Sequence, residues 1–275
     1  MGHLLHLTPT TGAIETPERR PDDERTQQAR PSQLGKRILV IDVGGTNVKV
    51  LATGALEPRK TPSGRKLTPA KMVASVRALT EDWQYEAVSI GFPGLVGKSG
   101  PICEPGNLGQ GWVGFDWAAA LERPVKVAND AAMQALGSYE GGRMLFLGLG
   151  TGVGAALIAE HSILPLEVGD LPWQKERTTI GDVLSRDGLH RLGLRGWRRV
   201  VEVVACRLMK MFVADYVVLG GGNAKKLKQL PHGMRLGHNQ TAFRGGFRLW
   251  GVEDVPVQSP NEPPSDSVPV EWRLI

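Results

Sequence analysis

Short apolar runs alternate along the chain with stretches that carry a helical spacing. Residues 38–43 are apolar apart from one aspartate, a glycine-rich turn follows, and a second run, apolar apart from Lys49, covers residues 48–52. Continuous Val, Ile and Leu runs of this length are typical of strands that are buried on both faces. The pattern therefore predicts two buried strands joined by a tight turn.

The second half of the chain repeats this arrangement, with apolar runs at 144–149 and 155–158 on either side of a glycine turn. Thr68 and Pro69 predict a helix start, because threonine caps helices and proline is tolerated at the first helical position. Further strands are expected at 87–91, 125–128 and 216–219, and helices at 131–139 and about 198–214. Strand–turn–strand units in both halves predict two related α/β lobes that face a central cleft.

Composition sets the expected boundaries. Residues 16–30 are rich in charge, proline and glutamine, and residues 254–267 are rich in proline, serine and glutamate, so neither stretch can bury enough apolar surface to fold. We predict a disordered tail over 1–36, an N-terminal lobe over 37–128, a C-terminal lobe over 129–251 and a loosely ordered tail over 252–275.

The bulk numbers exclude several classes of protein. The 275 residues are 41% hydrophobic and 22% charged, which is ordinary for a globular protein. Two cysteines argue against a disulfide scaffold and a cysteine-rich zinc site. Since no apolar run could cross a bilayer and the N-terminus lacks a signal-peptide pattern, we expect a cytoplasmic protein without a membrane partner.

The net charge of +5 is mild, and the basic residues are grouped. The groups are Arg59, Lys60, Arg65 and Lys66; Arg195, Arg198 and Arg199; and Lys225, Lys226 and Lys228. They can be solvated surface, or they can form a groove for a polyanionic phosphate donor. No aromatic residues interleave with them, which argues against nucleic acid as a partner.

Three glycine turns come at expected strand ends, where open α/β sheets bind ligands. They are Gly44-Gly45-Thr46, Gly150-Thr151-Gly152-Val153-Gly154 and Gly220-Gly221-Gly222. Bare backbone can approach a phosphate closely, so turns that converge would hold a phosphate chain and a nucleoside. The second turn also fits a relaxed dinucleotide pattern, but no helix is expected after it. An ordinary β-turn is the alternative for the first.

Two carboxylates are candidates for chemistry. Asp42 ends the first strand and can hold Mg²⁺, directly or through water. Asp130 stands at a strand end just before a helix, where it can act as the base that phosphoryl transfer to a hydroxyl requires. Its neighbour Asn129 can bind vicinal sugar hydroxyls, or the pair can simply cap the helix.

These motifs, in this order, resemble the ROK family of sugar kinases and regulators over residues 37–250, and within it the polyphosphate glucokinases. The resemblance rests on Asp42-Val43-Gly44-Gly45-Thr46 with Lys49, on Gly91-Phe92-Pro93-Gly94, on Asn129-Asp130, and on the two later glycine turns. It implies a two-lobed actin/hexokinase-like fold, which is a duplicated ribonuclease H-like unit.

The resemblance also implies a function: phosphoryl transfer from ATP or polyphosphate to a hexose hydroxyl, with glucose expected, Mg²⁺ as cofactor and Asp130 as general base. Sugar would contact Asn107, Asn129, Asp130, Glu167 and Asp170. Donor phosphate and nucleoside would contact Asp42, Gly44, Gly45, Thr46, Asn47, Lys49, Thr151, Gly152, Gly154, Gly220, Gly221 and Gly222. Homodimers are common among similar proteins.

One departure from the family keeps alternatives open. Sugar-binding members carry Glu-x-Gly-His, whereas this chain has Glu167-Val168-Gly169-Asp170. An ionised aspartate only accepts hydrogen bonds, whereas histidine can also donate. Three alternatives therefore remain. The segment can be a solvated loop, or the protein can be a non-catalytic sensor that binds sugar or nucleotide. The acceptor can also be an amino sugar whose ammonium group pairs with Asp170.

Overall fold

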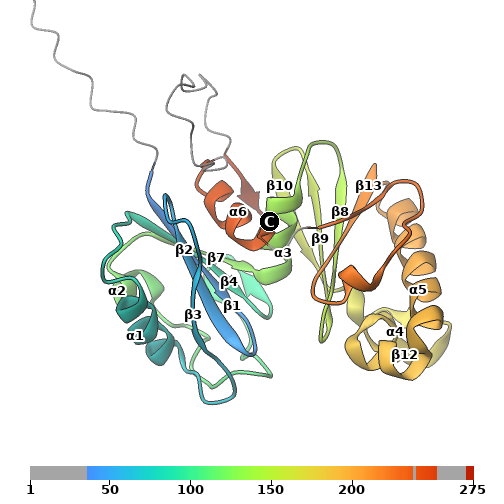
Figure 1. Cartoon of the computed structure of the whole chain (residues 1–275), viewed down its shortest axis with the longest axis horizontal. Coiled ribbons are helices and arrows are strands. Elements are labelled where there is room, and N and C mark those ends of the chain that lie inside the picture. Colours follow the sequence, from blue (N-terminus) through green and yellow to red (C-terminus); the bar gives the residue numbers. More distant parts are fainter. Residues whose placement is uncertain (1–35, 238–239, 253–270) are drawn as a thin grey trace, which may run out of the picture. The chain divides into compact units, whose positions relative to one another are not determined.

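The computed structural model describes residues 36–237, 240–252 and 271–275. A five-stranded sheet has the order β3-β2-β1-β4-β7 (Figure 1). Its strands are β1 Ile38–Val43, β2 Asn47–Ala52, β3 Arg59–Pro62, β4 Ala87–Phe92 and β7 Val125–Asn129. The first three strands pair antiparallel, and β4 and β7 continue the sheet in parallel with β1.

A six-stranded sheet has the order β14-β13-β8-β9-β10-β15. Its strands are β8 Met144–Leu149, β9 Val153–Ala159, β10 Ser162–Leu166, β13 Tyr216–Gly220, β14 Met234–Leu236 and β15 Arg273–Leu274. From β10 to β14 the pairing directions repeat those of the first sheet from β3 to β7. The duplicated α/β architecture predicted from the sequence is thus present.

The remaining elements cover or connect these sheets. The helices are α1 Pro69–Leu79, α2 Trp117–Leu121, α3 Asp130–Ser138, α4 Ile180–Leu184, α5 Arg186–Met211 and α6 Thr241–Arg248, with single 3-10 turns η1 Val168–Asp170 and η2 Ala224–Lys226. Two small hairpins are β5 Val96–Gly97 with β6 Gly100–Pro101, and β11 Pro172–Trp173 with β12 Lys175–Thr179. Within the described residues, no helix is both long and apolar enough to span a bilayer.

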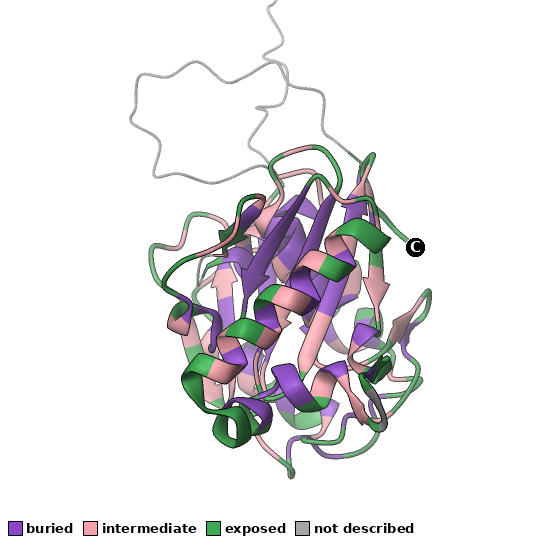
Figure 2. Ribbon diagram, turned by 90° about the vertical axis from the view of Figure 1, so that its right-hand side faces the viewer, coloured by how far each residue is buried: buried purple, intermediate pink, exposed green. Residues whose placement is uncertain are grey.

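The central strands are buried on both faces, as their unbroken apolar runs predict. In β1, Leu39 and Ile41 join the apolar cluster that α1 and α2 cover, whereas Ile38 and Val40 join a cluster with α6. In the second sheet α5 lies over one face, with buried and exposed positions alternating along it (Figure 2). Successive side chains of a strand point to opposite faces of its sheet, and here both faces are covered. The central strands are therefore apolar at consecutive positions.

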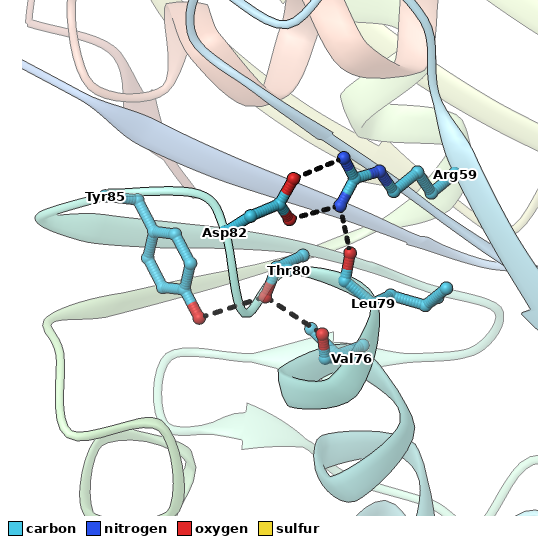
Figure 3. Close-up of polar contacts among 6 residues, drawn as sticks. All are labelled: Arg59, Val76, Leu79, Thr80, Asp82 and Tyr85. Carbon is cyan, nitrogen blue, oxygen red and sulfur yellow. Dashed lines mark hydrogen bonds and ion pairs between the residues drawn. The ribbon is translucent and has the colours of Figure 1, made fainter.

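The predicted start of α1 is confirmed. Pro69 is its first residue, and the Thr68 hydroxyl accepts a hydrogen bond from the Lys71 N–H. At the other end, Arg59 donates to the Leu79 carbonyl at 2.7 Å and to the Asp82 carboxylate at 2.8 Å (Figure 3). The arginine of β3 therefore satisfies a C-terminal carbonyl of α1 and holds the helix end against the sheet edge.

Helix α5 begins twelve residues before the predicted start at 198. Its first turn is capped by Ser185, whose hydroxyl accepts from the Gly188 N–H. Gly193 has a φ of 67° and interrupts the helix, so two helical segments follow one another. The first segment is rich in arginine and glycine, so its sequence lacks the apolar periodicity from which a helix is predicted.

Helix α6 packs on the first sheet, although it falls within the predicted C-terminal lobe of residues 129–251. The Ser89 hydroxyl of β4 donates to the Gly246 carbonyl at 2.6 Å, and a Cβ at Gly246 would lie 2.3 Å from Val40 of β1. The lobes are therefore not two consecutive segments, because α6 returns to cover one face of the first sheet.

The expected tail over 252–275 needs a correction at its end, while its residues 253–270, like residues 1–35, lie outside the described part. Arg273–Leu274 forms β15 beside β10, and the Arg273 N–H donates to the His161 carbonyl at 2.9 Å. Trp272 is buried and packs edge-on against Tyr139. This aromatic anchor and the free edge of β10 explain why the last residues adopt a fixed conformation.

Two glycines bring α3 and α6 into direct backbone contact. A Cβ at Gly245 would lie 1.8 Å from the Met133 carbonyl oxygen, and one at Gly137 would lie 1.8 Å from that of Thr241. Gly245→Ala is expected to destabilise the fold by about 3 kcal/mol or more, because backbone cannot yield as a side chain can. Urea unfolding checks this, with Gly196→Ala as control.

The control replaces a helical glycine of α5 whose new Cβ would meet its nearest neighbour at 3.5 Å. It should raise stability by about 0.5–1 kcal/mol through the lower entropy of the unfolded chain. Equal effects of the two substitutions would contradict the close crossing of α3 and α6.

Candidate active site

Asp130 is the first residue of α3, where this helix enters the fold beside two glycines. A Cβ at Gly91 of β4 would lie 3.8 Å from the Asp130 Cα, and one at Gly154 of β9 would lie 2.6 Å from the Ala131 Cβ. Gly91 belongs to the first sheet and Gly154 to the second. The two glycines therefore let the first turn of α3 approach both sheets and place Asp130 next to their strand ends.

Asn129 caps this helix. Its Oδ1 accepts hydrogen bonds from the Ala131 N–H at 2.9 Å and the Ala132 N–H at 3.2 Å, and its Nδ2 donates to the Gly94 carbonyl at 2.9 Å. Three of the four hydrogen bonds that the amide can form are thus made within the protein. These contacts show the helix cap. The predicted sugar contact, which would use the second Nδ2 hydrogen, stays a prediction.

Three carboxylates interact electrostatically around the start of α3. Burial, and then the Asp42 carboxylate, raise the pKa of Asp130 to about 7, with a smaller contribution from Glu167 in the same direction. A hydrogen bond from the Ala131 N–H opposes this shift. A carboxylate whose pKa lies near neutral pH is suited to accept a proton from a hydroxyl.

Asp42 is the last residue but one of β1, where it lies opposite Lys49 in the hairpin. Burial raises the pKa of Asp42, and the Lys49 ammonium partly offsets this. A desolvated carboxylate next to a second one fits a divalent cation, which would relieve both. Among the residues that the structure describes, no three His, Cys, Asp or Glu side chains are grouped as metal ligands. Substrate oxygens and water would thus have to complete the coordination of Mg²⁺ at Asp42.

The structure joins the second and third glycine turns. The Asn223 N–H donates to the Leu149 carbonyl at 2.9 Å, and its side-chain Nδ2 donates to the Gly150 carbonyl at 3.1 Å. A Cβ at Gly221, whose φ is 78°, would lie 2.6 Å from the Leu149 carbonyl oxygen. Two predicted phosphate turns therefore form one backbone surface, on which Thr151, Gly152 and Gly222 are exposed.

The second turn leads into strand β9, so the dinucleotide interpretation is excluded because that fingerprint must open a helix. The first turn is closed by a hydrogen bond from the Gly44 N–H to the Asn47 carbonyl at 3.0 Å. Gly45 and Thr46 are exposed there. A Cβ at Gly45 would lie 2.7 Å from the Asn107 Nδ2, so this predicted sugar ligand lies against the first turn.

Glu104, which the sequence did not reveal, organises the loop that carries Asn107. Its Oε2 accepts from the Gly111 N–H at 3.0 Å and the Trp112 N–H at 3.1 Å, and its Oε1 accepts from the Val113 N–H at 3.2 Å. Burial acts to raise the pKa of Glu104, but the three N–H groups leave it lower than usual. No spacing rule predicts a carboxylate that closes its own loop in this way.

Glu104→Ala is expected to release this loop. The amides of Gly111, Trp112 and Val113 should exchange hydrogen up to about tenfold faster, because each loses its hydrogen-bond acceptor. Glu104→Gln keeps one acceptor oxygen and should give a smaller change. Hydrogen exchange followed by mass spectrometry checks this, and unchanged protection in Glu104→Ala would contradict the role of the carboxylate.

Glu167 and Asp170 lie at η1, beside the second turn. A Cβ at Gly169, between them, would lie 3.5 Å from the Val153 carbonyl oxygen. Burial, and then the Asp170 carboxylate, raise the pKa of Glu167. The segment that departs from the family motif is therefore placed near Asp130, as the electrostatic effect of Glu167 on Asp130 also indicates.

Comparison with known proteins agrees with this fold. The ROK family model matches residues 38–165, so the family resemblance predicted from the motifs is confirmed. The chain is 23% identical over 243 residues to polyphosphate glucokinase of Mycobacterium leprae, an alignment that covers 81% of this chain and 73% of that protein.

Two solved structures share the two-lobed α/β fold. Inorganic polyphosphate/ATP-glucomannokinase from Arthrobacter sp. strain KM matches with a TM-score of 0.64 and 22% identity over 77% of this chain and 96% of that one. A ROK family glucokinase from Streptomyces griseus, in complex with glucose and AMPPNP, matches with a TM-score of 0.60 and 16% identity over 76% and 97%. The predicted fold class is confirmed.

Proposed function

We propose that the protein is a sugar kinase that transfers a phosphoryl group from ATP or polyphosphate to a hydroxyl of a hexose, with glucose the first candidate. The proposal is supported mainly by the environment of Asp130. This residue is a carboxylate with a pKa of about 7, next to Asp42 and at the end of a helix that touches both sheets. Phosphoryl transfer to an alcohol needs a base of this kind beside a phosphate site.

In the proposed reaction, Asp130 accepts the proton of the sugar hydroxyl as its oxygen bonds to the terminal phosphorus of the donor. The bond between that phosphorus and the leaving oxygen breaks, which gives a sugar phosphate and ADP or a shortened polyphosphate. Backbone N–H groups of the joined second and third turns hold donor phosphates. Mg²⁺ bound at Asp42 would neutralise charge on those phosphates.

The sugar would lie between Asn107, which the Glu104 loop places against Gly45, and the Glu167–Asp170 segment. Carboxylates accept hydrogen bonds from several sugar hydroxyls at once. Asp170 also suits an ammonium group, so an amino sugar is the second candidate acceptor. A sensor that binds sugar without turnover is the alternative function.

A coupled assay tests the proposal, with glucose, mannose and glucosamine as acceptors and ATP or polyphosphate as donor. Release of sugar phosphate with at least one pair supports a kinase, and the acceptor preference identifies the sugar. Calorimetry on the same folded sample measures sugar binding and so distinguishes a kinase from a sensor. Tight sugar binding without product from either donor would favour the sensor and overturn the proposed reaction.

The pKa of Asp130 sets an expected pH dependence. The base must be ionised to accept a proton, so kcat/KM should fall about tenfold per pH unit below the pKa of about 7 and level off above it. Initial rates between pH 5.5 and 8.5 at low Mg²⁺ check this, and the break in the profile should move to lower pH as added Mg²⁺ neutralises Asp42. A profile that stays flat to pH 5.5 would argue against Asp130 as the base.

A further inference from the structure

Two basic segments that are about 30 residues apart in sequence meet on the surface of the second sheet. Arg198 of α5 donates from both Nε and Nη2 to the Lys226 carbonyl of η2, the former at 2.8 Å. Arg195, Arg198 and Arg199 follow the i, i+3, i+4 spacing, so they share one helix face. This contact brings the face against the loop that carries Lys225, Lys226 and Lys228.

A pocket of about 400 Å³ lies between these segments. Three of the arginines of α5 lie in its wall together with Gln229, and Glu202 is the acidic side chain on it. The rest of the lining is apolar: Val201, Leu219, Leu227, Leu230, Pro231 and Met234. Arg195, Arg199, Lys225 and Lys228 are exposed. No carboxylate in the described ranges forms an ion pair with any of the six cations.

Like charges at this spacing repel one another on a helix. Their repulsion is relieved when an anion neutralises them, and arginine suits phosphate because its fork donates two parallel hydrogen bonds. The pocket also borders the proposed donor site, since Leu219 in its wall directly precedes the Gly220–Gly222 turn. An anion held at that turn and extended by further phosphates would lead toward these cations.

We infer that the pocket lined by Arg195, Arg198 and Arg199 binds inorganic polyphosphate beyond the segment held at the glycine turns. This inference rests on the proposed function, because it assigns polyphosphate as a donor of the same site. A triphosphate is too short to use the whole surface, so the pocket favours long chains. Nucleic acid is the competing polyanion, but no aromatic side chain lines the pocket for base stacking.

The test compares Arg195→Gln/Arg199→Gln with a matched control, Lys98→Gln/Lys210→Gln, which removes the same charge at exposed positions away from the pocket. Arg198 stays intact because it holds η2. In the full chain, the arginine variant should raise KM for long-chain polyphosphate roughly tenfold and KM for ATP less than twofold, as two exposed charge contacts together would. The control should change both by less than twofold.

Calorimetry with polyphosphate alone, without sugar, measures the pocket independently of turnover. Wild-type protein should bind long chains at least about tenfold more tightly than tripolyphosphate, and the arginine variant should lose this preference. Equal affinity for both lengths, tighter binding of single-stranded RNA, or an equal loss in the control variant would overturn the inference. If sugar is phosphorylated but polyphosphate does not bind, the inferred polyphosphate site is refuted and the proposed kinase function is supported. If polyphosphate binds but no sugar is phosphorylated, the proposed kinase function is refuted and polyphosphate binding at the pocket is supported.

Discussion

Asp130→Asn is expected to reduce kcat for sugar phosphorylation by about 10²- to 10⁴-fold, the usual contribution of a positioned general base. Asparagine is isosteric and can still accept the hydrogen bond from the Ala131 N–H, so the first turn of α3 should be retained. It cannot take a proton from the acceptor hydroxyl. KM for sugar and donor should change much less than kcat, because the substitution removes an interaction made in the transition state.

Asp187→Asn is the matched control for this loss. Asp187 is an exposed carboxylate in the first turn of α5, so the substitution is the same in chemistry and also falls in a first helical turn. Its kcat should stay within about twofold of wild type, as expected for an exposed surface substitution. Retention of more than a tenth of wild-type kcat in Asp130→Asn would show that another group is the base.

The same substitution is expected to stabilise the protein at alkaline pH. Asp130 has a pKa of about 7 in the folded protein and 3.8 as the ordinary value, so the native state binds more protons between these pH values. Unfolding stability therefore falls as pH rises from about 4 to 7, by up to about 4 kcal/mol at 1.36 kcal/mol per unit. Asparagine has no such titration and avoids this loss.

Urea unfolding of both proteins at pH 8 and pH 5 measures the effect. Asp130→Asn should be more stable than wild type by about 2–4 kcal/mol at pH 8, and the gain should fall to less than half of that at pH 5. A gain that is equal at the two pH values would arise from packing rather than charge. A loss of stability at pH 8 would mean that the Asp130 carboxylate is not desolvated in the fold. The catalytic carboxylate would then carry no cost to stability, contrary to what its burial implies.

Local patterns in the sequence were sufficient for the parts of the fold that depend on neighbours along the chain. Both hairpins follow from apolar runs around glycine turns, and the start of α1 follows from Thr68 and Pro69. Asp130 could be selected as the candidate base because a strand end followed by a helix start is visible in the sequence. Its raised pKa could not be predicted from the sequence, because it depends on how deeply the fold buries Asp130 and on how close the fold brings Asp42.

What the sequence concealed depends on contacts between distant segments. The packing of α6 on β1 requires Gly246 to meet Val40, which no periodicity can show. Glu104 closes its loop through backbone N–H groups, so its own side chain carries no motif. The basic segments around Arg198 and Lys226 looked separate, since the hydrogen bond that joins them spans 28 residues.

The return of α6 to the first sheet has a consequence for biosynthesis. Ile38, Val40 and Ala87 leave the ribosome long before Phe243 and Phe247, which pack against them. Domains usually fold in order as the nascent chain emerges. Here one face of the first sheet stays exposed until α6 has been synthesised, so premature termination before α6 would release an aggregation-prone polypeptide.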